Sequence, residues 1–78
     1  MSKPDIVKIR ETRWTQPDGS MGYQYDVRYR SGYRIRYNFM QTLPMSVVNY
    51  LLSEERRVDV KYITNPFDGR VRKVVVYE

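Results

Sequence analysis

Residues 22–39 read GYQYDVRYRSGYRIRYNF, and this stretch predicts a β-hairpin whose two faces differ in chemistry. Side chains alternate between the two faces of a strand, so residues of one parity share a face. One parity is aromatic or aliphatic: Tyr23, Tyr25, Val27, Tyr29, Tyr33, Ile35, Tyr37 and Phe39. The other parity is polar and mostly basic: Gln24, Asp26, Arg28, Arg30, Arg34, Arg36 and Asn38. The stretch therefore predicts a sheet with one apolar face and one basic face.

The turn chemistry indicates the register of this hairpin. A three-residue loop, Arg30 to Gly32, places Gly32 where a left-handed backbone is required. On the apolar face this register pairs Tyr29 with Tyr33, Val27 with Ile35 and Tyr25 with Tyr37. On the polar face it pairs Gln24 with Asn38, Asp26 with Arg36 and Arg28 with Arg34. The last pair sets like charges opposite each other, which is unfavourable unless an anion binds there or the side chains splay into water.

A preceding strand, Asp5 to about Thr15, joins the hairpin through the turn Pro17-Asp18-Gly19, whose residues suit a tight turn. Carried back from this turn, the register pairs Ile9 with Val27 and Val7 with Tyr29 on the apolar face. On the polar face it pairs Lys8 with Arg28, Arg10 with Asp26, Thr12 with Gln24 and Trp14 with Gly22. Glu11 and Arg13 fit the apolar face poorly, and we expect them at the end of the sheet beyond the helix, or beside a bulge.

Residues 43–57, LPMSVVNYLLSEERR, are the helix candidate. Pro44 suits the first turn, and Arg56 and Arg57 would complement the dipole at the C-terminal end. Apolar residues recur at helical spacing and form one stripe: Leu43, Val47, Val48, Leu51 and Leu52. We expect this stripe to pack on the Tyr/Val/Ile face of the sheet.

Residues 58–64 and 70–77 predict a second hairpin around the loop Pro66 to Gly69. Its register pairs Val58 with Tyr77, Val60 with Val75 and Thr64 with Val71. The opposite face is half apolar: Asp59, Lys61, Ile63, Arg72, Val74 and Val76. This face and the small size of the chain favour a homodimer. The fold class is α+β in the order β-β-β-α-β-β, and the sequence leaves open whether both hairpins share one sheet.

Length and composition narrow the function. The chain has 78 residues and a net charge of +5, and it contains neither cysteine nor histidine. We expect a single domain spanning residues 1–78, with residues 1–4 flexible. The missing residue types remove the commonest metal ligands and proton shuttles, so we expect no enzyme activity, no metal and no cofactor. No apolar run of about 18 residues and no signal peptide is present, which favours a cytoplasmic protein without a membrane partner.

The basic face is the candidate site. Its residues are Lys8, Arg10, Trp14, Arg28, Arg30, Arg34 and Arg36. Cations for phosphates and an aromatic ring for bases are typical of proteins that bind RNA or single-stranded DNA, and we predict this function. The alternative without a ligand is the solvated face of a small antiparallel sheet. Five of the eight tyrosines could form a stacking row, but their parity favours core packing beneath the helix; they are Tyr23, Tyr25, Tyr29, Tyr33 and Tyr37.

A second functional class remains open from the sequence. Arginine, tyrosine and tryptophan are enriched in the hot spots of protein interfaces. The chain could therefore be a small regulator or inhibitor, of the kind that phages and mobile elements encode, docking on an acidic surface of a larger enzyme. Acidic residues are scarce near the basic face, and this scarcity favours nucleic acid over a protein partner.

Overall fold

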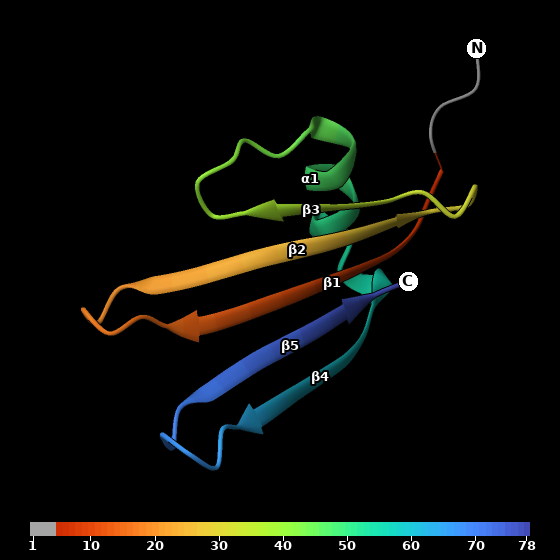
Figure 1. Ribbon diagram of the computed structural model, residues 1–78. Coiled ribbons are helices and arrows are strands. Elements are labelled where there is room, and N and C mark those ends of the chain that lie inside the picture. Colours follow the sequence, from red (N-terminus) through yellow and green to blue (C-terminus); the bar gives the residue numbers. More distant parts are fainter. Residues whose placement is uncertain (1–4) are drawn as a thin grey trace.

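The computed structural model describes residues 5–78, which form one five-stranded antiparallel sheet with a single α-helix on one side (Figure 1). The elements are β1 (Ile6–Thr15), β2 (Met21–Tyr29), β3 (Arg34–Asn38), α1 (Met45–Leu52), the short 3-10 helix η1 (Glu54–Arg56), β4 (Arg57–Thr64) and β5 (Val71–Tyr77). The predicted α+β class and element order are confirmed. The strand order is β3-β2-β1-β5-β4, so both hairpins belong to one sheet and β1 lies at its centre.

Both predicted three-residue loops are present. The backbone N–H of Gln16 donates to the carbonyl of Ser20 at 2.7 Å, and that of Tyr29 donates to the carbonyl of Tyr33 at 2.8 Å. Gly32 adopts the left-handed backbone that the second loop requires, with a φ of +93°. Every predicted pair between β2 and β3 is confirmed, including the like-charged pair at their turn end.

Two predicted pairs at the beginnings of strands are wrong, because a β-bulge intervenes in each strand. The bulge in β1 sets Ile6 rather than Val7 opposite Tyr29, and the bulge in β4 sets Arg57 rather than Val58 opposite Tyr77. Beyond each bulge the predicted pairing holds, so the assignment of side chains to the two faces is otherwise confirmed.

The helix is shorter than the sequence predicts. It begins after Pro44, whose ψ of 151° is extended, so this proline caps the helix rather than entering its first turn. Val47 is fully buried against the sheet, whereas Leu52 is 72% exposed and does not belong to the apolar stripe. Tyr50 is buried in its place.

The predicted match between basic residues and the helix dipole is wrong. α1 ends at Leu52, and neither Arg56 nor Arg57 lies in its last turn. The Arg56 guanidinium instead lies 4.3 Å from the centre of the Tyr50 ring, a distance at which a cation and an aromatic face attract each other.

The core lies between α1 and the Tyr/Val/Ile face of the sheet. Its buried apolar residues are Ile9, Tyr25, Val27, Val47, Tyr50, Val75 and Tyr77. These residues come from α1, β1, β2 and β5, and partly buried side chains of β3 pack around them. β4 contributes none, and all eight of its residues are exposed. The helix therefore covers the half of the sheet that carries the basic face on its other side.

Candidate functional site

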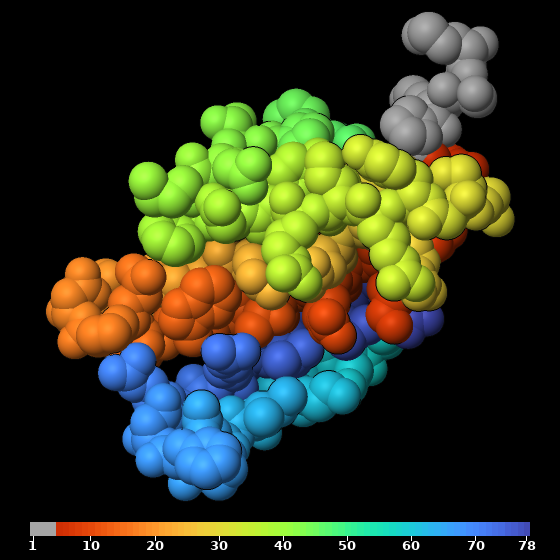
Figure 2. Space-filling view, in the orientation of Figure 1, coloured from red at the N-terminus to blue at the C-terminus, as the bar shows by residue number. Residues whose placement is uncertain are grey.

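The basic face is organised as three rows of side chains that cross β1, β2 and β3. Residues paired across the strands define them. The outer row is Lys8, Arg28 and Arg34. The middle row is Arg10, Asp26 and Arg36. The third row is uncharged and consists of Thr12, Gln24 and Asn38. Figure 2 looks onto this face, where long side chains of β3 reach across β2 toward those of β1.

The middle row is held together by one carboxylate. The Nε of Arg36 donates to Oδ1 of Asp26 at 2.7 Å, and Nη2 of Arg10 lies 3.5 Å from Oδ2. The second contact lacks hydrogen-bond geometry, so Oδ2 of Asp26 is buried without a hydrogen-bond partner. Two cations and one anion give this row a small net positive charge, and its arginines are already engaged.

The outer row has three cations and no acid. Arg28 and Arg34 are exposed and directly opposite each other, and Lys8 is half-buried beside them. Within residues 5–78, none of the three forms an ion pair. Like charges at directly opposite positions destabilise a sheet by a few tenths of a kcal/mol to about 1 kcal/mol. An anion bound between them would remove this cost.

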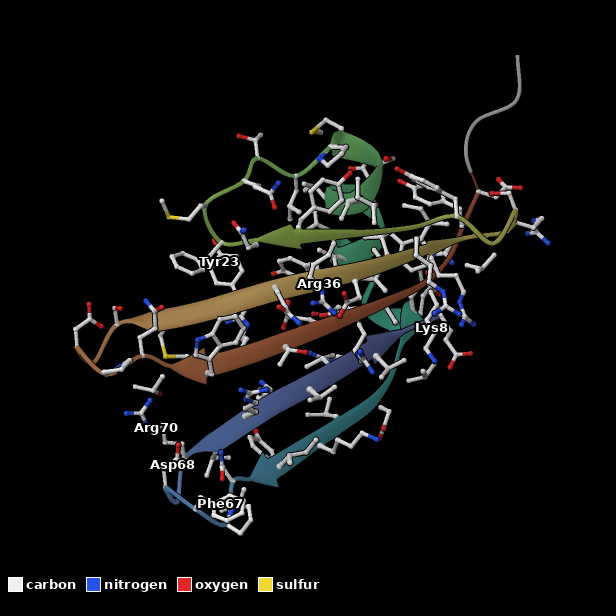
Figure 3. All side chains as sticks on the ribbon, in the orientation of Figure 1. Lys8, Tyr23, Arg36, Phe67, Asp68 and Arg70 are labelled. Atoms are coloured by element: carbon white, nitrogen blue, oxygen red, sulfur yellow. The ribbon has the colours of Figure 1, made fainter. Side chains whose placement is uncertain are left out.

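The outer and middle rows together line an open pocket with a volume of about 470 Å³. Its walls are Lys8, Arg10, Asp26, Val27, Arg28, Arg34, Ile35 and Arg36. Figure 3 labels Lys8 and Arg36, which approach this pocket from β1 and from β3. The volume lies within the range of pockets that hold small ligands, and five cations against one carboxylate give the pocket a positive potential.

Two predicted site residues lie apart from this pocket. Arg30 is in the β2–β3 turn, where its Nε donates to Oδ2 of Asp5 at 3.2 Å. Trp14 is near the opposite end of β1, six residues from Lys8, or about 20 Å along the strand. The indole lies against the backbone of β2, because a Cβ built on Gly22 would stand 2.5 Å from its Cε2 atom. The structure thus brings five of the seven predicted residues together.

A second polar cluster lies on the helix-side face, where sequence reasoning placed no site. Glu11 is 6% exposed and accepts a hydrogen bond from Nε of Arg13 at 3.0 Å. Burial, and then hydrogen bonding to Glu11 and its negative charge, raises the pKa of Tyr25 to about 12. The cross-strand pairing of Glu11 with Tyr25 is the signal that could have found this cluster. Its members satisfy one another, which explains how a carboxylate is accommodated beside the core.

Comparison with known proteins finds no family model, no curated protein and no solved structure that matches this chain. In the described part of the chain, no helix is long and apolar enough to cross a membrane. Nor do residues 5–78 contain a group of three or more acidic side chains that could hold a metal ion. The charge and geometry of the basic face are therefore the features that bear on function.

Proposed function

We propose that this protein binds nucleic acid, with RNA or single-stranded DNA as the favoured ligand, through the basic face of β1, β2 and β3. The observation that carries the proposal is the outer row, three cations without a carboxylate at the wall of an open pocket. The proposed role is that of a binding protein without catalytic activity.

A phosphate group is the ligand that suits the outer row best. Arg28 and Arg34 each offer a planar fork of N–H donors that matches two phosphate oxygens, and Lys8 adds a compact charge. Asp26 keeps Arg36 in place and moderates the charge of the middle row. Binding would release counterions from the nucleic acid, and its affinity would fall as salt rises.

A single strand suits this face because its bases are free to stack. A strand that runs from the outer row along β1 and β2 reaches Trp14, whose ring lies on the same face of the sheet. Stacking of a base on an aromatic side chain contributes about 1–3 kcal/mol and tolerates any base. In this arrangement the outer row fixes the backbone and the indole contacts a base.

An acidic protein surface is the second candidate ligand, on the same outer row. Carboxylates accept from arginine forks in the way that phosphates do. In this role the protein would be a regulator or inhibitor that docks on a larger enzyme. The two candidate ligands differ in whether they carry bases that can stack on Trp14. The response of Trp14 fluorescence to each ligand therefore distinguishes them.

The test measures binding by fluorescence anisotropy, with labelled single-stranded RNA, single-stranded DNA, duplex DNA and a polyglutamate peptide as probes. The double variant Arg28→Gln/Arg34→Gln should weaken binding of single strands and lower the log–log salt slope by about 1.4, or roughly 0.7 for each phosphate that is no longer neutralised. The control variant Arg70→Gln/Arg72→Gln removes two positive charges from the β4–β5 hairpin. It should bind single strands nearly as the wild type does.

The same experiment decides between the candidates. Binding of single strands with quenching of Trp14 fluorescence supports the nucleic-acid function. Binding of polyglutamate alone supports the acidic protein partner. No binding of any probe at low salt, or equal losses in the two double variants, would reject the outer row as a site.

A further inference from the structure

The free edge of β4 is a surface of the sheet that the proposed function leaves unused. β4 is eight residues long, it pairs only with β5, and all its residues are exposed. Val60 is 43% exposed, Tyr62 67% and Ile63 50%. A long edge strand with exposed apolar side chains is a template for pairing with another strand.

The hydrogen bonds at the turn show which backbone groups of β4 point outward. The N–H of Asn65 donates to the carbonyl of Arg70 at 2.7 Å, so these two residues form a hydrogen-bonded pair. Such pairs alternate along an antiparallel ladder. Val60, Tyr62 and Thr64 therefore direct their N–H and C=O groups away from β5. The edge offers donors and acceptors at every second residue.

The other edge of the sheet is protected. β3 has only five residues, and Arg34 and Arg36 on it belong to the basic face. Short length and arginine charge are two of the means by which proteins keep edges from pairing. β4 is longer, and beyond Arg57 at its first position its single lysine is matched by a single aspartate, Asp59 beside Lys61 at 3.8 Å.

We propose that β4 pairs antiparallel with β4 of a second copy of this chain, about a two-fold axis at Val60. Val60 then lies opposite its own copy, and the outward N–H and C=O groups of the two residues bond to each other. On the face opposite the helix, Asp59 of each copy lies opposite Lys61 of the other. The edge is its own complement, as a two-fold interface requires.

Charge selects this register over its neighbours. Residues directly opposite each other share a face of the sheet. The neighbouring registers are therefore those in which the two-fold axis moves from one residue of β4 to the next. A two-fold axis at Lys61 sets two lysines opposite each other, which is unfavourable. An axis at Tyr62 sets Lys61 opposite Ile63 and pairs neither charge. Only the axis at Val60 pairs both charges across the interface.

The surface expected for self-association also differs from the one that the sequence favours. The sequence favours the half-apolar face of the β4–β5 hairpin, but Val74 on that face is buried and Val76 is half-buried within the chain. The β4 edge keeps its backbone groups unpaired and its apolar side chains exposed. It is therefore the edge, rather than that face, which fits a second copy.

The test uses charge reversal at exposed positions. Asp59→Lys and Lys61→Asp each place like charges across the two-fold axis, and each variant alone should dimerise at least tenfold more weakly than the wild type in sedimentation experiments. An equimolar mixture of the two variants restores both pairs, so native mass spectrometry should detect the mixed dimer in preference to either homodimer. The double variant Asp59→Lys/Lys61→Asp should dimerise as the wild type does.

Both side chains are more than half exposed, so circular dichroism should show the wild-type fold in every variant. A wild-type chain that stays monomeric up to about 1 mM would overturn the proposal. So would single variants that dimerise as the wild type does, or a mixture that forms no mixed dimer. These outcomes are independent of nucleic-acid binding, because neither substituted residue lines the basic pocket.

Discussion

The meander β1–β3 and the hairpin β4–β5 share one sheet, yet they are stabilised in different ways. The meander packs under α1 with Ile9, Tyr25 and Val27 in the core, whereas the hairpin reaches the core only through β5 and every residue of β4 is exposed. In the meander, packing on one face holds the cations of the other face in fixed rows. β4 contributes no residue to the core and is held by its pairing with β5. A small sheet can thus keep one half rigid for charge and leave the other half open for contact.

Matched isoleucine substitutions should give the largest difference between the two halves. Ile9 is fully buried in the meander, and Ile63 is exposed in the hairpin. Ile9→Ala should lower the free energy of unfolding by about 2–5 kcal/mol, because it leaves a cavity in the core. Ile63→Ala should change it by no more than about 0.5 kcal/mol. Urea denaturation checks both, and equal losses would mean that the hairpin is packed more tightly than its exposure indicates.

Alkaline pH should distinguish a tyrosine of the meander from one of the hairpin. The pKa of Tyr25 is raised to about 12 by burial and by Glu11, so the folded state holds this proton more tightly than the unfolded state. Stability should therefore be constant below about pH 10 and fall as the pH rises from about 10 to about 12. Thermal melts across this range test the fall.

Two tyrosine-to-phenylalanine variants test which residue causes the loss of stability at alkaline pH. Tyr25→Phe should flatten the loss of stability above pH 10, although burial also raises the pKa of Tyr77 and that residue will leave some dependence. Tyr62→Phe removes an exposed phenol of β4 and is the matched control for loss of a hydroxyl group. A profile that follows Tyr62 instead would contradict the assignment.

The smallest expected effect concerns the two aspartates on the same side of the sheet. Asp26→Asn removes the only acid of the basic pocket and frees Arg36 and Arg10, so single-stranded RNA should bind several-fold more tightly. Asp59→Asn makes the same charge change on the hairpin and should alter RNA binding less. Anisotropy titrations at one salt concentration compare them. Equal gains would show that total charge, not the pocket, governs the affinity.

The sequence predicts the meander well because its register is a local property. Two short turns and the alternation of side chains specify which residues lie opposite one another, and the rows of the basic face follow from that pairing. A bulge adds a single residue to a strand, and the alternation of side chains around Val7 or Val58 does not predict it. The end of α1 is not predictable for a similar reason. Ser53-Glu54-Glu55 is compatible with helix, yet the backbone of Ser53 is extended and Glu54–Arg56 form a 3-10 helix before β4.

Which residues of the basic face lie together depends also on contacts that strand pairing does not specify. Trp14 shares a face with the outer row, as its parity predicts, but its position over Gly22 arises from the missing side chain of that glycine. The union of the two hairpins through β1 and β5 is likewise not a local property. It depends on which edges remain unpaired after both hairpins form, and sequence alternation does not rank those edges.

The central place of β1 also has a consequence for the time course of folding. β1 pairs with β2 across a short turn, but its other neighbour is β5, and the pair Ile9–Tyr77 joins residues 68 positions apart (77 − 9). Closing so long a loop costs more entropy than local pairing does, so we expect the β1–β5 ladder to form late in folding. A ribosome adds about 5–20 residues per second, so synthesis of the chain from the end of the meander to β5 takes several seconds. During this time the edge of β1 that will pair with β5 is unpaired. During that interval we expect β1, rather than β4, to be the strand most open to pairing with a wrong neighbour.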